Sequence, residues 1–322
     1  MYTVGSFFAG VGGIDLGLEQ TGQFQTVYAN EWDPYPVQAY EKNFSLSVDV
    51  RDIHEVSGKE IPDFKIMAGG FPCQAFSIAG YQQGFDDKKG RGNLFFELVR
   101  ILKEKQEMNK QPEVVFFENV KNLVSHDHGN TLKVILSCLH DLGYHVTYRV
   151  LNATEYGNLP QNRERVYLIG FLNKNAFDKF KWPEKEQRIC ELSDFLNFTT
   201  KEEDSYYYTK ENCPFFSQLN KEVTNEDTVY QWRRTYVREN KSHVCPTLTA
   251  SMGTGGHQVP IIHTKYGIRR LTPRECFSLQ GFPTSFQLPE VSKTRLYKMI
   301  GNSVCVPVIQ QIGKQIVCAI KQ

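Results

Sequence analysis

A cysteine on a stiff loop is the first residue in this 322-residue chain that could do chemistry. Cys73 follows Gly69-Gly70-Phe71-Pro72, which continues the apolar run Lys65-Ile66-Met67-Ala68. A thiol is a useful nucleophile only where it is exposed and partly ionised, and a proline-stiffened loop after a strand provides both conditions. Taken alone, Cys73 could instead be a small buried packing residue, because most free cysteines are buried in protein cores.

A carboxyl group and two guanidinium groups could assist such a nucleophile. Glu118 follows the apolar run 114–117, so in a parallel sheet it would share the crevice at the carboxyl ends of the strands with Cys73. Burial there would favour its protonated form and make it a general acid or hydrogen-bond donor. Arg163 and Arg165 alternate at a strand start, so both face the same side, suited to a phosphate or a base carbonyl. The alternatives are a solvated loop Glu and surface arginines paired with acids.

A glycine-rich turn near the start of the chain could bind a ligand. The apolar run 3–8 is followed by Ala9-Gly10-Val11-Gly12-Gly13 and an amphipathic run, 14–21, which we expect to be helical. Asp15 stands where the dinucleotide pattern G-x-G-x-x-G has its last glycine, so nothing here demands a pyrophosphate. Glu31 and Trp32 follow a second predicted strand, where they could hold ribose hydroxyls and stack on a purine. The pattern favours a nucleoside over a nicotinamide cofactor, although a tight turn without ligand explains the glycines equally well.

The elements that position these residues alternate between strand and helix. We predict strands at 3–8, 26–29, 65–68, 114–117, 145–151 and 166–170, a strand-turn unit at 47–53, and helices at 14–21, 94–105 and 130–142. This rhythm predicts an α/β fold with a doubly wound, mostly parallel sheet. The glycine-rich stretch 79–92 is predicted to be a mobile lid beside Cys73. Near the C-terminus we expect helices at 272–279 and 296–300 and a last one ending at Ile320 that returns to the first domain.

The rhythm stops after about residue 175, where aromatic and basic side chains interleave. Between Val229 and Glu275, eight Lys and Arg stand against two acids, a local excess of six in a chain whose net charge is +1. Such a concentration is the footprint of contacts to a nucleic-acid backbone, with a solvated basic face as the alternative. We therefore predict one domain at 1–175 plus about 300–322, and a smaller, irregular, β-rich domain at about 176–299.

Composition excludes several classes of protein. The eight cysteines are scattered without a Cys-x-x-Cys pair, which predicts reduced thiols and no metal site. The start carries no signal-peptide pattern, and no uninterrupted apolar run reaches the roughly 18 residues of a membrane span. We expect a cytoplasmic protein, without a membrane partner, that acts as a monomer.

Seven blocks, in order, resemble the bacterial DNA cytosine-5 methyltransferases of restriction-modification systems. They cover nearly the whole chain outside about 175–265 and consist of Phe8–Gly13, Asn30–Asp33, Gly70–Gln74, Glu118–Val120, Gln161–Arg165, Arg270–Cys276 and Gly301–Val304. The resemblance implies the Rossmann-like fold of methyltransferases that use S-adenosylmethionine and release S-adenosylhomocysteine. It further implies double-stranded DNA as substrate and a restriction endonuclease as functional partner.

The resemblance also implies roles for individual residues. The catalytic set is Cys73, Glu118, Arg163 and Arg165, with Cys73 as the nucleophile that attacks a flipped-out cytosine and Arg163 more suited to supporting the loop or a phosphate. The cofactor would contact Phe8, Ala9, Gly10, Val11, Gly12, Gly13, Glu31, Trp32, Asp52, Ile53, Phe71, Pro72, Leu94, Asn302 and Ser303. DNA would contact Gln82, Gln231, Arg233, Arg234, Arg238, Thr247, Leu248, Gly255 and Gly256, with Trp232 and Tyr236 bracing the readers.

Three other functions compete with this one. A nicotinamide-dependent oxidoreductase would use the glycine turn and Glu31 but leave Cys73 and Glu118 idle. A catalytically silent DNA-binding protein would need only the basic region. A transfer-RNA cytosine-5 methyltransferase on the same fold would keep every catalytic block, but the long variable region disfavours it.

Overall fold

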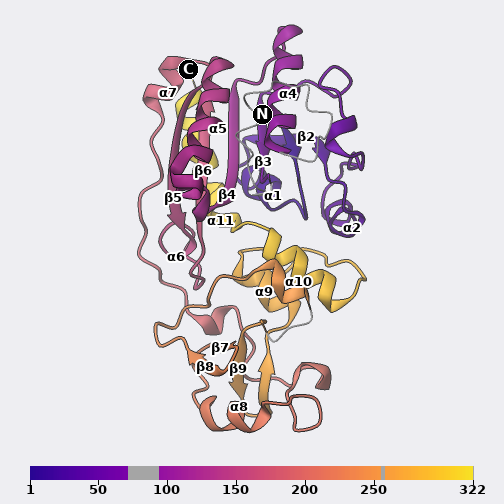
Figure 1. Cartoon of the computed structure of the whole chain (residues 1–322), viewed down its shortest axis with the longest axis vertical. Coiled ribbons are helices and arrows are strands. Elements are labelled where there is room, and N and C mark those ends of the chain that lie inside the picture. Colours follow the sequence, from indigo (N-terminus) through magenta and orange to yellow (C-terminus); the bar gives the residue numbers. More distant parts are fainter. Residues whose placement is uncertain (72–93, 255–257, 322) are drawn as a thin grey trace. The chain divides into compact units, whose positions relative to one another are not determined.

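The computed structural model describes residues 1–71, 94–254 and 258–321 and divides into two compact units (Figure 1). Unit 1 comprises Met1–Leu151, Glu164–Pro183 and Ile309–Gln322, and unit 2 comprises Asn152–Arg163 and Glu184–Val308. This division assigns Asn152–Arg163 and the residues just before Ile309 to unit 2. The domain ranges expected from the sequence stay a prediction.

Unit 1 is built on a six-stranded sheet in the order β2-β1-β3-β4-β6-β5. Its strands are β1 (Tyr2–Phe7), β2 (Phe24–Asn30), β3 (Ile66–Gly69), β4 (Val114–Val120), β5 (His145–Asn152) and β6 (Glu164–Phe171). The pairs β1–β2, β1–β3 and β3–β4 are parallel, and β4–β6 is antiparallel. The predicted α/β class with a mostly parallel sheet is therefore confirmed.

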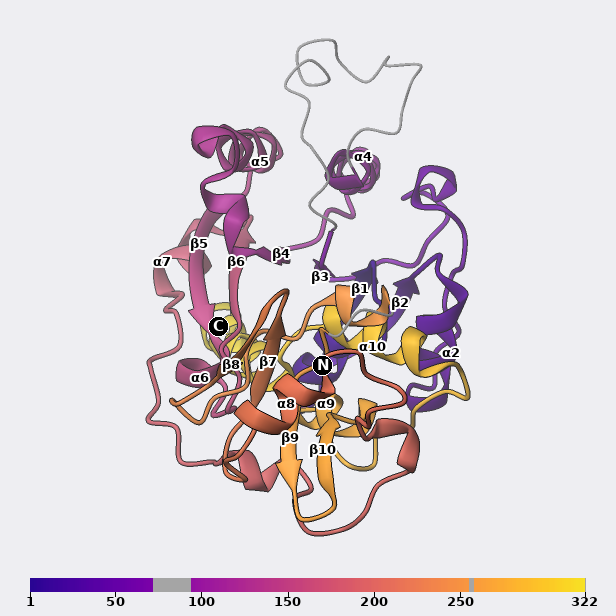
Figure 2. The same ribbon diagram turned by 60° about the horizontal axis from the view of Figure 1, so that its bottom comes forward.

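Helices cover both faces of this sheet (Figure 2). The helices α4 (Leu94–Glu107) and α5 (Asn130–Asp141) pack on one face through an apolar core that includes Phe95, Leu102 and Ile135. On the opposite side the part of α11 (Val306–Ile320) in unit 1 packs against α1 (Gly13–Glu19), since a methyl group at Gly313 would lie 3.0 Å from the Leu18 side chain. Unit 1 also contains α2 (Pro34–Asn43) and α7 (Lys174–Lys179). The apolar runs bury β1, β3 and β4 on both sides, as a parallel sheet requires.

The strand-turn unit predicted at 47–53 forms no full strand. In its place the structure has a single bridge between Asn30 and Asp49, followed by a short 3₁₀ helix, η1 (Ile53–Glu55). The Asn30 amide donates to the carbonyls of Asp49 and Arg51, at 2.9 Å each, and bends the chain. Asp52 then caps η1 by accepting from the His54 backbone. Side-chain capping thus replaces strand pairing here.

Other predicted boundaries need smaller corrections. Helix α1 ends at Glu19, a little earlier than predicted, because the Thr21 hydroxyl bonds the Leu18 carbonyl and starts a turn. Helix α5 ends at Asp141, slightly earlier than predicted, and begins at Asn130, as predicted, after Gly129 in a left-handed conformation. Chain reversal with a positive φ favours glycine at that point.

Unit 2 contains a four-stranded antiparallel sheet in the order β10-β9-β7-β8. Its strands are β7 (Tyr230–Arg233), β8 (Tyr236–Glu239), β9 (Ile261–Thr264) and β10 (Gly267–Arg270). Its helices are α6 (Ala153–Tyr156), α8 (Phe216–Glu222), α9 (Pro273–Leu279) and α10 (Lys293–Asn302). One face of the sheet buries Tyr230, Ile261 and Ile268 with Leu219 of α8. This sheet confirms the expected β-rich second region.

The C-terminal stretch differs from the prediction in one respect. Helix α10 is longer than the predicted 296–300 and ends with Gly301 and Asn302, and the last helix begins at Val306. Lys293–Ile320 is long and apolar enough to cross a membrane by length and composition, although 61% of its apolar window is buried inside the structure. The sequence prediction counted only uninterrupted apolar runs and therefore passed over this stretch.

Candidate functional site

The carboxyl ends of β3 and β4 lie side by side and form the floor of the candidate site. Gly69 pairs with Phe117 in parallel register, so the next residues along the two chains, Gly70 and Glu118, lie next to each other. The Asn119 amide donates to the Phe71 carbonyl at 2.8 Å, and a methyl group at Gly70 would lie 3.3 Å from Glu118 Oε2. The segment that leads to Cys73 is thus anchored beside Glu118. Pro72, Cys73 and Gln82, and the predicted lid at 79–92, lie outside the described residues.

Glu118 forms a buried ion pair with Arg165. Arg165 Nε lies 3.0 Å from Glu118 Oε1, and both side chains are largely buried. Glu118 belongs to β4 and does not follow it, as the sequence had suggested, because β6 continues the pairing to Val120, which faces Arg165. A carboxyl and a guanidinium at this distance can bind two neighbouring polar atoms of one flat ligand.

Arg163 is in unit 2 and has a different environment. Its side chain is buried, and Nη1 donates to the Leu248 carbonyl at 2.7 Å. Nη2 donates to the carbonyls of Gly301, at 3.2 Å, and Ser303. Arg163 therefore fastens two loops of unit 2, in agreement with the loop-supporting role considered from the sequence. Its place in the catalytic set stays a prediction.

The glycine turn has the backbone of a ligand loop. Phe8, a residue with a side chain, adopts a left-handed φ of 53°, and Gly10 and Gly12 have φ values of 57° and 83°. At Gly12 a methyl group would lie 2.3 Å from the Phe44 ring, so only glycine fits. Strained backbone of this kind is concentrated at functional sites.

Glu31 is fixed against this turn by its two carboxylate oxygens. Oε2 accepts from the Gly10 backbone at 3.0 Å and Oε1 from the Asp33 backbone at 2.8 Å. Burial raises the pKa of Glu31 despite these bonds. Each oxygen keeps a lone pair for a further donor, such as a hydroxyl.

The other predicted cofactor residues of unit 1 lie near the same strand ends. Trp32 is 69% exposed, which is unusual for an indole, whereas Ile53 is buried. Asp52 accepts from the His54 backbone, and this bond lowers the pKa of its carboxyl. Phe71 and Leu94 pack into the core of unit 1. Beneath the turn, buried Asp15 accepts from the hydroxyls of Ser6 and Thr26, and burial raises its pKa to about 6.

Asn302 and Ser303 are in unit 2. Asn302 is exposed at the end of α10, and the Ser303 hydroxyl is buried without a hydrogen-bond partner among the described residues. Their helix is packed tightly, since a methyl group at Gly301 would lie 1.9 Å from the Ala250 nitrogen. A buried hydroxyl without a partner is suited to a ligand.

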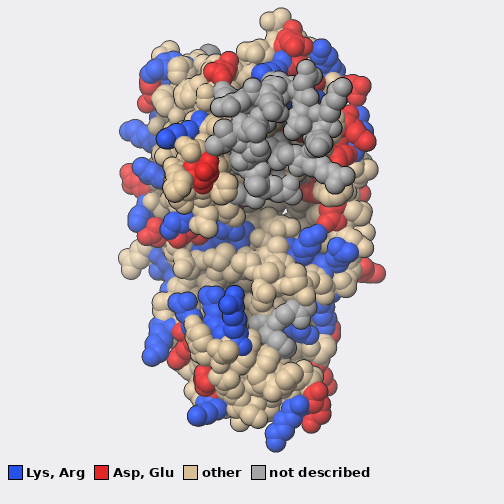
Figure 3. Space-filling view, viewed as in Figure 1, with Lys and Arg blue, Asp and Glu red and all other residues tan. Residues whose placement is uncertain are grey.

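A groove of about 1140 Å³ opens in unit 2, and we call it the basic groove. It is lined by Thr154, Asn162, Gln231, Trp232, Arg233, Arg234, Tyr236, Arg238, Asn240, Ser242, Val244, Pro246, Thr247, Thr249, Ser251 and Gln258. Five predicted DNA contacts are therefore brought together: Gln231, Arg233, Arg234, Arg238 and Thr247. Basic side chains gather over β7 and β8 in Figure 3.

Leu248 lies behind the wall of this groove. It is fully buried, and its backbone nitrogen donates to Gln161 Oε1 at 3.3 Å. Thr247, by contrast, lines the groove and donates its hydroxyl to the Asn162 carbonyl at 2.6 Å. Gly255 and Gly256, also predicted to contact DNA, lie outside the described residues.

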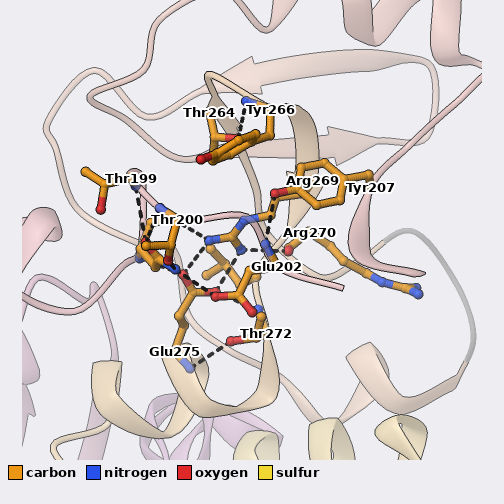
Figure 4. A network of polar contacts seen from close by, with 12 residues as sticks. Thr199, Thr200, Glu202, Tyr207, Thr264, Tyr266, Arg269, Arg270, Thr272 and Glu275 are labelled. Atoms are coloured by element: carbon orange, nitrogen blue, oxygen red, sulfur yellow. Dashed lines mark hydrogen bonds and ion pairs between the residues drawn. The ribbon is translucent and has the colours of Figure 1, made fainter. Parts of the chain in front are cut away.

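One basic residue counted from the sequence is unavailable to a ligand. Arg269 is fully buried and donates to both carboxylate oxygens of Glu275, at 2.8 and 2.6 Å (Figure 4). Glu275 also completes a capping box with Thr272 at the start of α9. The excess of six positive charges between Val229 and Glu275 is unchanged, because that count includes both Arg269 and Glu275.

Comparison with known proteins decides the family. A family model described as C-5 cytosine-specific DNA methylase matches residues 2–318. The chain belongs to this family. The resemblance drawn from the seven sequence blocks is confirmed, and the methylase is an enzyme of the DNA cytosine-5 methyltransferase class.

Its relatives match over nearly their whole length. The methylase is 52% identical to Type II methyltransferase M.Bsp6I of Bacillus sp. (strain RFL6), over 98% of each chain. It is 39% identical to Type II methyltransferase M.HhaI of Haemophilus parahaemolyticus, over 96% of this chain and 92% of that one. Among solved structures, the S. pombe Dnmt2 methyltransferase has a TM-score of 0.72 at 20% identity, over 98% of each chain. That similarity shows the fold alone.

Sequence reasoning passed over three residues that organise the site. Asn30, Asn119 and Gln161 each bond backbone carbonyls, and Gln161 is fully buried, with Nε2 donating to the Leu279 carbonyl at 2.9 Å. All three stand inside blocks quoted for the resemblance. These residues could have been predicted from one signal: each is a polar residue inside a quoted block to which no chemical role had been assigned.

Proposed function

We propose that this methylase transfers a methyl group from S-adenosylmethionine to C5 of a flipped-out cytosine in a short specific sequence of double-stranded DNA. The reaction proceeds through a bond between Cys73 and C6 and protects DNA from a partner restriction endonuclease in the cytoplasm. The observation that carries the proposal is the buried Glu118–Arg165 pair beside Gly70 and Phe71, where the segment of Cys73 begins.

The residues of unit 1 suit the nucleoside part of the cofactor. Glu31 has a fixed carboxylate for ribose hydroxyls, and exposed Trp32 offers an indole face to adenine. In unit 2 the Ser303 hydroxyl is buried without a partner among the described residues, and the cofactor contacts of Asn302 and Ser303 stay a prediction. S-adenosylmethionine supplies a methyl group on a positively charged sulfur.

The protein's task is to make cytosine C5 nucleophilic. The Cys73 thiolate adds to C6, the C5–C6 double bond opens, and negative charge develops towards N3 and O2. Glu118 in its protonated form donates to N3 and Arg165 donates to O2, which stabilises that charge where it appears. After C5 has taken the methyl group, loss of the C5 proton expels the thiol and restores the ring. We assign no side chain as the base.

The basic groove supports duplex DNA as the substrate. C6 is unreachable inside a duplex, so the target base must leave the stack, at a cost of a few kcal/mol. Contacts to the phosphates and to the remaining bases must offset that free energy, and five of the predicted DNA contacts line the groove.

Methyl incorporation tests the proposal. Purified enzyme with labelled S-adenosylmethionine should label duplex DNA and leave transfer RNA unlabelled, and bisulfite sequencing should place the methyl group on C5 of cytosines in one short sequence. Labelling of transfer RNA in place of DNA would overturn the assigned substrate, and no labelling of either would overturn the activity.

A further inference from the structure

The β7–β8 hairpin of unit 2 has two chemically different faces. In its antiparallel register Gln231 lies opposite Arg238, and Arg233 lies opposite Tyr236. Opposite residues share a face and successive residues alternate, so these four side chains occupy one face. All four line the basic groove.

The other face holds the hairpin rigidly. Trp232, which also lines part of the groove, stacks on Phe215, with ring centroids 3.9 Å apart and planes 10° from parallel. Tyr230 is buried in the core of unit 2, and Trp232 and Val237 pack against that core. A reader of base edges needs such support, because bidentate hydrogen bonds require fixed geometry.

The groove face offers donors that the protein does not use. Arg233 and Arg238 are exposed, and neither takes part in any ion pair found in the described ranges. Arg233 Nη2 donates to Gln231 Oε1 at 3.2 Å, which orients its guanidinium along the strand. Gln231 lies between Arg233, on its own strand, and Arg238, on the neighbouring one. Both arginines thus extend from regular strands beside an amide that can steer them.

Arg234 has a different setting. It is the first residue of the two-residue turn between β7 and β8 and adopts a left-handed φ of 55°. The turn is tied to α8 through the amide of Gln218, which donates to the Thr235 carbonyl at 3.2 Å. No hydrogen bond to the Arg234 side chain is found in the part of the chain that is described. A charge at a turn, where no strand register fixes its direction, suits a phosphate, which accepts from any direction.

We infer that Arg233 and Arg238 each read a guanine in the major groove, while Arg234 binds a backbone phosphate. The inference rests on the proposed function and adds which residues set the sequence specificity. Paired donors of one guanidinium match guanine O6 and N7, which is the commonest specific contact to DNA. Lysine replaces arginine well at a phosphate but poorly at a bidentate site.

Lysine substitutions separate the two roles. We would measure affinities for the methylated sequence and for duplexes changed at one base pair, at two salt concentrations. Arg233→Lys and Arg238→Lys should each lower discrimination at one guanine position by about tenfold to a hundredfold and leave the others unchanged. Arg234→Lys should lower discrimination at no base position, and Arg234→Ala should weaken all sequences alike and lower the salt slope by about one.

Controls keep the outcomes distinct. Lys265→Ala, in the turn between β9 and β10 and outside the groove, should change none of these quantities. Each variant must keep the melting temperature and the affinity for S-adenosylhomocysteine of wild type. Unchanged sequence preference in both strand variants, or relaxed preference in Arg234→Lys, overturns the inference. Failure of wild type to methylate any DNA would instead refute the proposed function.

Discussion

The Glu118–Arg165 pair illustrates how two residues can divide one task. An arginine can only donate, and a carboxyl group donates only when it holds a proton. In the proposed reaction the two acceptors on one edge of cytosine, N3 and O2, need two donors, of which only a carboxylic acid can also transfer its proton to N3. Their 3.0 Å contact keeps both groups in place before a base arrives.

Glu118→Gln tests this division of work. Glutamine keeps the shape and a donor but cannot transfer a proton to N3, so methyl transfer should slow by about 10²–10⁴-fold. The affinity for S-adenosylmethionine should stay unchanged. Single-turnover methylation and equilibrium cofactor binding are the two measurements.

Glu164→Gln is the matched control for that variant. Glu164 is the residue before Arg165, and its exposed carboxylate bonds Lys121 at 2.8 Å. Exposed pairs contribute little, so this variant should methylate at the rate of wild type. If Glu118→Gln lost its cofactor affinity instead of its rate, Glu118 would belong to the cofactor pocket.

Elements rather than single side chains decide the place of Arg163. From the sequence we expected Arg163 and Arg165 on the same face of one strand. However, β6 starts at Glu164, so only Arg165 lies on that strand. Arg163 remains in the loop before it and bonds the carbonyls of Leu248, Gly301 and Ser303. Alternation along a strand cannot predict this, because the partners are more than 80 residues away.

Arg163→Met should therefore unfold more easily. Removing the guanidinium leaves three buried carbonyls without this donor, and because such costs are not additive we expect a total loss of about 2–5 kcal/mol in the free energy of unfolding by urea. Arg149→Met removes an exposed arginine over Trp182 and should cost less than about 0.5 kcal/mol. An Arg163→Met enzyme of normal stability whose turnover had collapsed would show that Arg163 contacts the substrate.

At the scale of the whole molecule, prediction succeeded where burial is regular. The apolar runs of β1, β3 and β4 and the helical periodicity of α4 fix the sheet of unit 1, since parallel strands are buried on both faces. Prediction failed where side chains replace backbone pairing, as at Asn30 and Asp52, and where charge is buried, as at Arg269. The Asn30 contacts reach 19 and 21 residues along the chain, and although the other two contacts are local, composition does not reveal that a polar group is buried or capped.

The same limit applies to the basic groove. Sequence placed Gln231, Arg233 and Arg238 in one basic stretch but could not say which faces solvent. Strand register places all three side chains on one face of the hairpin, and the Trp232–Phe215 stack holds the opposite face.

Covalent trapping tests the role of Cys73 most directly. Duplex DNA in which 5-fluorocytosine replaces cytosine cannot lose its C5 substituent after methyl transfer, so the thiol cannot leave. With S-adenosylmethionine present, the native enzyme should form a protein–DNA complex that survives denaturation, and Cys73→Ala should bind the same DNA without forming it. An equally stable complex with Cys73→Ala, or none with a native enzyme that methylates ordinary DNA, would contradict Cys73 as the nucleophile.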